Sequence, residues 1–127
     1  MTLILWTGKN GEMMFNRRRC SSDREVIADI RAMYDPSEIC LSVYSSSLFA
    51  GSKVITDLPE AAGSVLFLED LPLDAALARA KKLIVYRFDR VYPADVRLVI
   101  PQDFCMTESK EFAGFSHDKI TREVYEK

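Results

Sequence analysis

The sequence predicts an α/β fold in a single domain, residues 1–127, with a mixed β-sheet, β-hairpins at both ends of the chain and flanking helices. Three observations predict this class. Short apolar runs alternate with two stretches whose apolar residues recur at helical spacing. The run 65–68 is apolar throughout, which is typical of a strand buried on both faces of a helix-covered sheet. An Asn-Gly pair between two apolar segments near the amino terminus indicates a hairpin.

The composition excludes several classes of protein. Of the 127 residues, 48% are hydrophobic and 28% are charged, a balance typical of globular chains and not of disordered ones. The 17 Lys and Arg residues and 19 Asp and Glu residues leave a net charge of −2, so a general attraction to nucleic acid is absent. No apolar run approaches the roughly 18 residues of a membrane span, and the three irregularly spaced cysteines fit a reducing compartment. We therefore expect a soluble, cytoplasmic protein with no membrane partner.

The first two strands are predicted to form a hairpin. Residues 3–7 are apolar enough for a strand, and residues 12–16 follow after the Asn-Gly turn. This register places Trp6 opposite Phe15, so an aromatic pair supports it.

Residues 22–34 are expected to form the first helix. Ser22 and Glu25 have the spacing of a capping box, which marks a helix amino terminus. The apolar residues that follow lie along one helical stripe, and Asp35-Pro36 ends the helix.

The middle of the chain alternates between strand and helix. Residues 39–44 and 65–68 have strand character, whereas residues 48–55 are ambiguous. Apolar residues at helical spacing over 73–80 lead into a further apolar run at 83–88. The strand before this helix and the strand after it are predicted to form a βαβ unit.

The last third of the chain is predicted to contain a second hairpin and a terminal helix. Turn residues at 92–95 separate the run 83–88 from the apolar residues 96–100, which favours pairing of these two segments. Residues 101–115 look irregular. Ser116 is expected to cap a helix in which apolar residues four positions apart share one face.

The strongest candidate site is the polar segment before the first helix. Three consecutive arginines, whose guanidinium groups can each hold two oxygens of an anion, lie beside a helix amino terminus with unpaired N–H donors. This chemistry suits a phosphate group, and two serine hydroxyls could add to it. The alternative is a solvated loop whose arginines pair with nearby carboxylates and protect a strand edge. The predicted ligand-binding residues of this segment are Arg17, Arg18, Arg19, Ser21 and Ser22.

Polar side chains also follow three of the predicted strands. If these strands are parallel, their carboxyl ends lie along one edge of the sheet, where open α/β sheets usually build their sites. Carboxylates at such an edge could hold Mg²⁺, but ordinary loop polarity is the favoured interpretation, so we expect no metal and no cofactor. Arg87 and Arg90 are added to the predicted ligand-binding residues. The full set at the strand ends is Ser45, Ser46, Ser47, Glu69, Asp70, Arg87, Asp89 and Arg90.

His117 is the only histidine, so any imidazole chemistry has to use it. On the expected terminal helix it lies on the side of Ile120 and Val124 and is therefore directed toward the core. Such a histidine can act as a general base or can simply hydrogen-bond within the packing, and the second role is favoured. His117 and Asp89 are the candidate catalytic residues.

The cysteines carry no metal signature. Nothing in the sequence is spaced like C-x₂-C or H-x₃-H, so a zinc site is disfavoured. Cys40 lies in a predicted strand and is expected in the core. Cys20 lies beside arginines near a helix start, where a thiol is expected to have a lowered pKa and to be reactive.

Four segments resemble a family of small uncharacterised bacterial proteins, and the resemblance covers nearly the whole chain. They are the runs Asn16 to Arg24, Tyr44-Ser45, Arg87 to Asp95 and Ser116 to Tyr125. Some members of that family carry the label ribonuclease Z. The H-x-H-x-D-H metal-binding pattern of that enzyme cannot exist in a sequence with one histidine, so that activity is not transferred. The resemblance implies no established catalytic residue; it implies only that these polar segments are signatures of the group.

Three hypotheses about function follow. The leading one is a cytoplasmic α/β domain that binds a phosphate-bearing ligand, either a small molecule or a nucleotide, at the arginine segment. The second is a non-enzymatic interaction or dimerisation module, including a homodimer, in which hairpin edges contact a partner. The third is a phosphodiester or phosphate-ester hydrolase that uses His117, Asp89 and Asp70 as acid, base or metal-holding groups. Nucleic acid is disfavoured as a partner, because no aromatic residues interleave with the basic segment.

Overall fold

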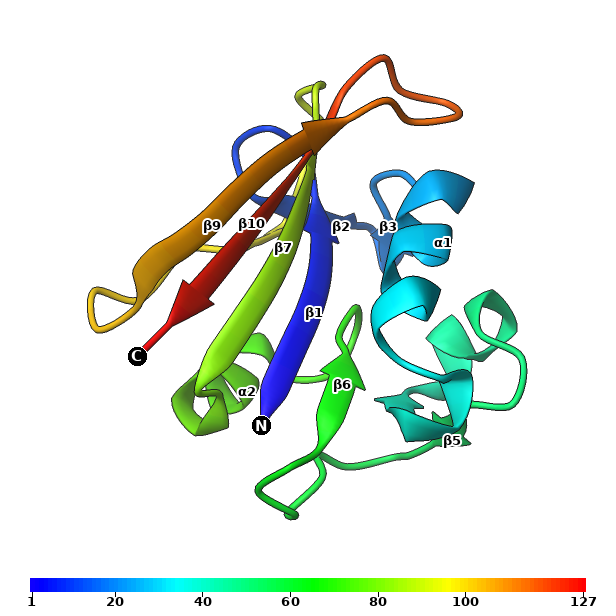
Figure 1. The fold of residues 1–127 in the computed structure, drawn as a ribbon, viewed down its shortest axis with the longest axis vertical. Helices are drawn as coiled ribbons and strands as arrows, with labels where there is room; N and C mark the ends of the chain where they lie inside the picture. Colours follow the sequence, from blue (N-terminus) through cyan, green and yellow to red (C-terminus); the bar gives the residue numbers. More distant parts are fainter.

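The protein contains two β-sheets and two α-helices. The computed structural model describes all residues, 1–127, and its α/β architecture confirms the predicted fold class (Figure 1). The larger sheet has seven strands and is mixed, whereas the smaller sheet has three antiparallel strands. In chain order the elements are β1 (Thr2–Thr7), β2 (Glu12–Phe15), β3 (Arg18–Arg19), α1 (Arg24–Met33), the 3₁₀ helix η1 (Pro36–Glu38), β4 (Ile39–Leu41), the 3₁₀ helix η2 (Val43–Leu48), β5 (Lys53–Val54), β6 (Val65–Phe67), α2 (Leu73–Arg79), β7 (Lys82–Phe88), β8 (Val96–Arg97), β9 (Cys105–Phe112) and β10 (Ile120–Glu126).

The larger sheet has the strand order β5-β4-β6-β1-β7-β10-β9. Its first five strands are parallel, and β10 and β9 extend it on one side as antiparallel strands. The predicted βαβ unit is present as β6–α2–β7, with β1 lying between its two strands. The parallel strands therefore all end at the same edge of the sheet.

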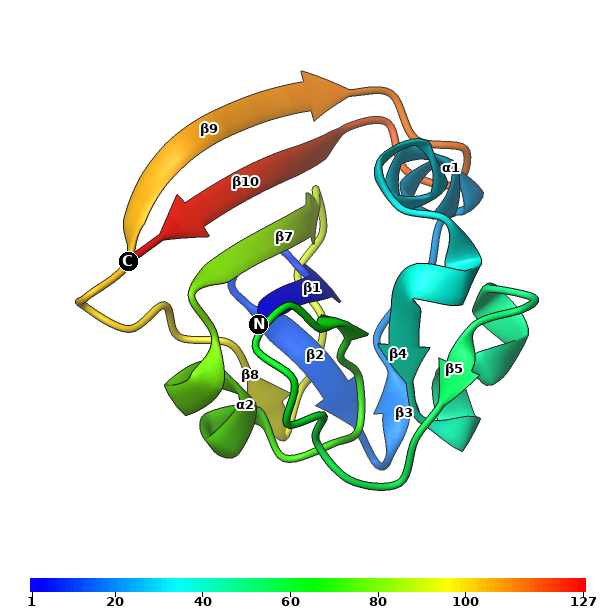
Figure 2. The same ribbon diagram turned by 60° about the horizontal axis from the view of Figure 1, so that its bottom comes forward.

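Both faces of the large sheet are covered at its central strands. α1 packs on one face, where Val26 and Ile30 join a core cluster that includes Ile4, Trp6 and Tyr86. The apolar side chains of α2 and of the small sheet join a second cluster on the other face. Figure 2 shows α1 on one side of the curved large sheet, and α2 with β2 and β8 on the other.

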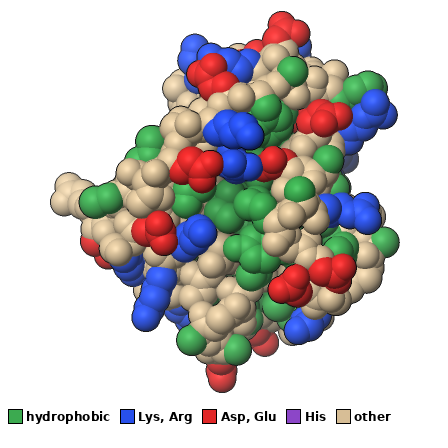
Figure 3. All heavy atoms as spheres, viewed as in Figure 1, with side chains coloured by type: hydrophobic (Ala, Val, Ile, Leu, Met, Phe, Trp, Pro, Cys, Tyr) green, Lys and Arg blue, Asp and Glu red, His purple; other side chains and the backbone are tan.

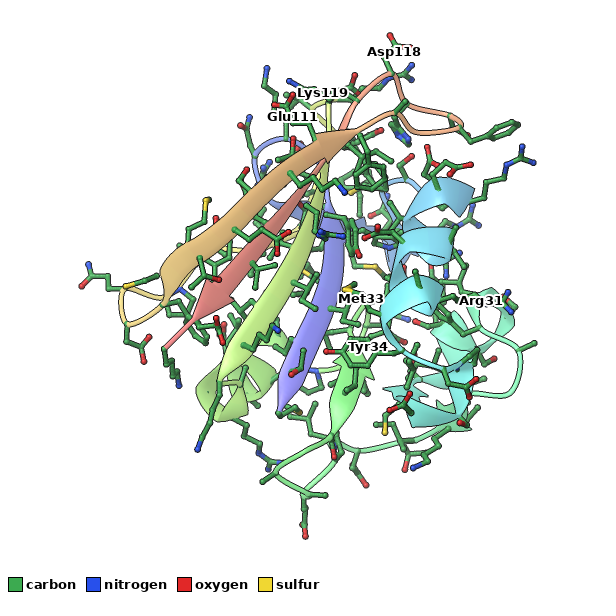
Figure 4. All side chains as sticks on the ribbon, in the orientation of Figure 1. Arg31, Met33, Tyr34, Glu111, Asp118 and Lys119 are labelled. Atoms are coloured by element: carbon green, nitrogen blue, oxygen red, sulfur yellow. The ribbon has the colours of Figure 1, made fainter.

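α1 follows its sequence pattern except at its first residue. The predicted cap Ser22 is wrong: Asp23 is the N-cap, and its side chain accepts a hydrogen bond from the N–H of Glu25 at 2.9 Å. Ser22 is exposed, and its hydroxyl makes no hydrogen bond. The helix ends at Met33, and Figure 4 shows Tyr34 between the end of α1 and the large sheet, where it packs against the core.

The surface on the α1 side combines apolar and charged regions. In Figure 3, apolar side chains gather at the centre of this face, and Lys, Arg, Asp and Glu side chains surround them. No helix of the protein combines the length and the apolar character needed to cross a bilayer.

The predicted hairpin between residues 3–7 and 12–16 is wrong, because both edges of β1 are occupied by other strands. β1 pairs with β6 and β7, whereas β2 pairs with β3 and β8 in the small sheet. A strand that is apolar on both faces is more stable at the centre of a covered sheet than in an outer hairpin. A different hairpin follows it: Asn16 and Arg17 join β2 to β3 with φ angles of 51° and 64°, as a type I′ turn requires.

Three predictions near the carboxyl terminus are also wrong. β7 does not pair with residues 96–100, because its two edges are occupied by β1 and β10. The expected terminal helix is the strand β10, and the segment expected to be irregular contains β9, so the second hairpin is β9–β10. Ile120 and Val124 share a face in a strand as well as in a helix, and both are β-branched, which favours the strand.

Candidate functional site

The carboxyl ends of the parallel strands bring polar side chains together at one edge of the large sheet, as the sequence predicted. β4 and β6 are neighbours, and the residues that follow them are joined by hydrogen bonds. Ser42 Oγ donates to Asp70 at 2.5 Å, and Ser45 Oγ donates to Glu69 at 2.7 Å. β1 separates β7 from β6, and no hydrogen bond or ion pair links the residues after β7 to this cluster.

Glu69 is a buried carboxylate with a full set of donors. Its side chain is 1% exposed, and it accepts hydrogen bonds from Trp6 Nε1 at 2.8 Å, from Arg19 Nε and Nη2 at 2.8 and 2.9 Å, and from Ser45. The hydrogen bond to Glu69 raises the pKa of Arg19, so this guanidinium stays charged. The edge therefore holds an ion-pair network, and no cluster of three or more metal-ligating side chains is present in the protein.

The five arginines predicted to bind ligand fall into two groups. Arg19 and Arg87 are neutralised, Arg19 by Glu69 and Arg87 by Glu123, whose Oε1 lies 2.6 Å from Arg87 Nε. The other three are exposed and form no ion pair, so their charge is free for a ligand. These three are Arg17, Arg18 and Arg90.

The amino terminus of α1 is occupied by its own cap. Asp23 Oδ1 accepts hydrogen bonds from the N–H groups of Glu25 and Phe115, both at 2.9 Å. Asp23 Oδ2 accepts from the N–H of Ser116 at 2.8 Å and from His117 Nδ1 at 2.9 Å. Because a carboxylate already neutralises the positive end of the helix, an anionic ligand gains less there than the sequence led us to expect.

His117 lies between a serine and an aspartate. It belongs to the loop that joins β9 to β10, not to a helix, and it is 4% exposed. Its Nε2 lies 3.0 Å from Ser21 Oγ and 3.0 Å from the hydroxyl of Tyr92, and its Nδ1 contacts Asp23. Phe88 stacks on the imidazole at a centroid distance of 4.1 Å and an interplanar angle of 16°. We call Asp23, His117 and Ser21 the triplet.

The protonation of the triplet follows from Asp23. Burial opposes its ionisation, but the hydrogen bonds from His117 and from three backbone N–H groups outweigh burial and lower the pKa of Asp23 to about 2. A carboxylate only accepts hydrogen bonds, so the network assigns a proton to Nδ1, and in the neutral imidazole the Nε2 lone pair then faces Ser21. A serine hydroxyl on a histidine base that a carboxylate orients is the arrangement of nucleophilic serine enzymes.

Asp89, the other predicted catalytic residue, forms no hydrogen bond or ion pair with His117. Its Oδ2 accepts a hydrogen bond from the N–H of Lys119 at 3.3 Å, and its Oδ1 is buried without a partner. The carboxylate beside the histidine is Asp23, which the sequence analysis did not select, and Tyr92 was not selected either. The spacing of Ser21 and Asp23 was visible in the sequence, but the histidine lies 94 residues after Asp23, and only the fold brings it there.

Cys20 is not the reactive thiol that the sequence predicted. Burial raises the pKa of the Cys20 thiol, and the carboxylate of Glu12 adds to this effect. The thiol lies 3.6 Å from the carbonyl oxygen of Pro93. The neutral thiol is therefore favoured at physiological pH, despite the neighbouring arginines.

A cavity of about 500 Å³ lies next to the edge of the large sheet where Glu69 and Asp70 follow β6. Apolar residues share its lining with Arg17, Glu69, Asp70 and Asp95. Ser21 and His117 do not line it, so the cavity and the triplet are distinct features.

The sequence matches no protein-family model and no curated protein. The resemblance to small bacterial proteins stays a prediction. The function therefore has to be inferred from the triplet, the unpaired arginines and their surroundings.

Proposed function

We propose that the protein hydrolyses a phosphate ester with Ser21 as the nucleophile. The triplet is the observation that carries this proposal: Ser21 Oγ lies 3.0 Å from His117 Nε2, and His117 Nδ1 lies 2.9 Å from Asp23. At these distances His117 can remove the serine proton while Asp23 holds the imidazole in the required tautomer.

The reaction proceeds in two balanced steps. In the first, Ser21 Oγ gives its proton to His117 Nε2 and attacks phosphorus, the ester P–O bond breaks, and the leaving oxygen takes the proton from Nε2. In the second, a water gives its proton to Nε2 and attacks the phosphoserine. The bond between phosphorus and Oγ then breaks, and the proton returns to Ser21.

Two unpaired guanidinium groups support a phosphate-bearing substrate. Arg17 and Arg18 lie on the β2–β3 hairpin, which ends two residues before Ser21 in the chain, and neither forms an ion pair, although Arg17 lines the cavity that Ser21 does not line. Arginine binds phosphate oxygens in a bidentate manner, so these side chains suit the substrate's charge. Arg19 forms an ion pair with Glu69, and we assign it a structural role, because this pair connects β3 to the segment that follows β6.

Hydrolysis of p-nitrophenyl phosphate and bis(p-nitrophenyl) phosphate tests the proposal, with p-nitrophenyl acetate as an ester that lacks phosphorus. The wild-type protein should cleave a phosphate ester, and Ser21→Ala should lower kcat by about 10³-fold or more. Ser22→Ala is the matched control, because Ser22 is the adjacent exposed serine and makes no side-chain hydrogen bond. Equal rates in the two variants, or cleavage of the acetate alone, would contradict the proposal.

Binding of a phosphate-bearing ligand without turnover is the second candidate function, and the unpaired arginines favour it. Thermal unfolding with a panel of nucleotides and sugar phosphates measures such binding. A ligand at one hundred times its Kd should stabilise the protein by about 2.7 kcal/mol. Arg17→Ala with Arg18→Ala should abolish the stabilisation, whereas Arg31→Ala, an exposed arginine on α1, should leave it unchanged. A stabilisation that survives the double substitution would exclude this binding site.

A further inference from the structure

We propose that the hydroxyl of Tyr92 donates a hydrogen bond to the phosphoryl oxygen on which charge develops when Ser21 attacks. This inference rests on the proposed function and assigns a second catalytic residue to the same site. The starting observation is that two hydroxyls, those of Ser21 and Tyr92, each lie 3.0 Å from one imidazole nitrogen.

The number of protons at His117 limits what the two hydroxyls can do. The proton on Nδ1 is donated in a hydrogen bond to Asp23, so Nε2 offers a single lone pair. Only one hydroxyl can direct its proton straight at that lone pair. When Ser21 does so, as nucleophilic attack requires, the proton of Tyr92 is left for another acceptor.

The position of Tyr92 makes the substrate the nearest new acceptor. Its hydroxyl oxygen and Ser21 Oγ flank the same nitrogen, so a phosphorus atom attacked by Oγ brings its non-bridging oxygens toward the phenol. A donor directed at the oxygen that gains negative charge lowers the barrier more than it stabilises the bound substrate.

Tyr92 is held in place before any ligand binds. Its N–H donates to Glu12 Oε2 at 2.7 Å, and Glu12 is fully buried and also accepts the N–H of Asn10 at 2.6 Å. Gly8 leaves room for the ring, because a Cβ at Gly8 would lie 2.8 Å from Tyr92 Cδ2. A donor that is already fixed needs no reorganisation during the reaction, which is the condition for strong electrostatic stabilisation.

Two other roles for Tyr92 would change the rate of attack by Ser21 differently. A tyrosine that only supports His117 would contribute to stability and not to the rate of attack by Ser21. A tyrosine that competes with Ser21 for Nε2 would slow the attack, so its removal would increase the rate.

Covalent labelling with a fluorophosphonate separates these roles without the natural substrate. In this reaction Ser21 Oγ bonds to phosphorus, fluoride leaves, and the serine proton passes through His117 to solvent. Tyr92→Phe should reduce the maximal labelling rate about 10²-fold, the usual effect of removing one such donor, with little change in the probe concentration at half-maximal rate. Tyr34→Phe is the matched control, because the hydroxyl of Tyr34 makes no hydrogen bond and should not affect the rate.

A second measurement does not depend on removal of the hydroxyl. Replacement of Tyr92 by a fluorinated tyrosine keeps the hydroxyl but makes it more acidic, and the high-pH limit of the labelling rate should move to lower pH. Labelling of Tyr92→Phe at or above the wild-type rate, or an unchanged pH profile, would overturn the role of Tyr92 and leave the proposed function intact. Absence of labelling at Ser21 in the wild-type protein would overturn the proposed function itself.

Discussion

Asp23 performs two tasks with one carboxylate, because it caps α1 and also holds the loop that carries His117. Two elements from opposite ends of the chain therefore depend on a single side chain. This dependence makes Asp23 the residue whose loss should affect stability and the triplet together.

Replacement of Asp23 by Asn should lower the free energy of unfolding at pH 7 by about 2 kcal/mol, since one carbonyl oxygen replaces two acceptors for four donors. The folded-state pKa of Asp23 is about 2, below its ordinary value of 3.8. The stability that it contributes is thus complete above about pH 4 and is lost as the pH falls toward 2. Urea unfolding at pH 7, 4 and 2.5 measures both effects. If the difference in free energy of unfolding between Asp23→Asn and the wild type does not become smaller at low pH, the lowered pKa of Asp23 is contradicted.

Arg17 has backbone geometry that favours glycine. Its φ of 64° lies in the left-handed region, which costs a residue with a Cβ about 1 to 2 kcal/mol. Glycine is the preferred second residue of a type I′ turn, although its own unfolded-state entropy offsets part of the gain. Arg17→Gly should therefore raise the free energy of unfolding by about 0.5 to 1 kcal/mol and weaken phosphate binding, since the guanidinium is lost.

Thermal unfolding and ligand titration of Arg17→Gly measure these two effects. Arg18→Gly is the control, because Arg18 lies in the β2–β3 ladder, where glycine should destabilise. A variant that is more stable but has lost binding would indicate that function maintains the strained arginine. Unchanged ligand affinity would remove Arg17 from the site.

At the scale of elements, β9 is the longest exposed strand of the protein. Residues 105–111 are all exposed, and one edge of β9 has no partner strand. A register shift at Val124 and Tyr125 of β10 marks a bulge in the pair, and charged side chains lie along β9. Glu108 pairs with Arg122 at 2.8 Å, and Figure 4 shows Glu111 next to Lys119, with which it forms an ion pair at 3.6 Å. A bulge and charges are the usual protection of an edge strand against pairing with other chains.

Removal of that protection should cause self-association. Glu108→Val with Lys110→Val leaves the net charge unchanged, and this variant should dimerise or aggregate at concentrations where the wild type does not. Arg31→Val with Asp118→Val is the matched control, because these exposed charges, both labelled in Figure 4, lie outside β9. Sedimentation velocity at increasing concentration measures the effect. A wild-type dimer whose interface includes β9 would show instead that the edge is an interaction surface, as the second sequence hypothesis predicts.

The elements differ in how far the sequence predicted them. The helix α1 and the β6–α2–β7 unit were predictable, because their apolar spacing, a proline stop and an all-apolar strand are local signals. β9 was not, because a strand exposed on both faces shows no alternation of apolar and polar residues. β10 was mistaken for a helix since a spacing of four residues fits both structures, and only its pairing with β7 decides between them.

At the scale of the whole molecule, the sequence predicted two of the four residues of the candidate site. Ser21 and His117 were selected, and the structure places them 3.0 Å apart. Their partners were missed, because the helix cap was assigned to Ser22 in place of Asp23, and Tyr92 was interpreted as a turn residue. The arginines were harder to judge, because the carboxylates that neutralise Arg19 and Arg87 lie far away in the sequence, whereas Arg17 and Arg18 have no such partner.

Refolding should be slow for a chain of this length, because the central strand β1 pairs only with residues at least 60 positions later. The single tryptophan, Trp6, reports on this step: it is 3% exposed, donates to Glu69 and packs against Phe67 at 5.2 Å. Stopped-flow fluorescence should show recovery of the Trp6 signal over milliseconds to seconds. Recovery within microseconds would mean that β1 reaches its environment before β6 and β7 are in place.

The central place of β1 has a consequence in the cell. The ribosome makes this strand before either neighbour, because residues 65–67 and then 82–88 are synthesised later. During that interval its apolar side chains and open backbone are exposed to other nascent chains, so a holding chaperone that binds the emerging strand should increase the yield of native protein. Slower elongation between residues 7 and 65 would bring no such benefit, because it lengthens the time during which the strand has no partner.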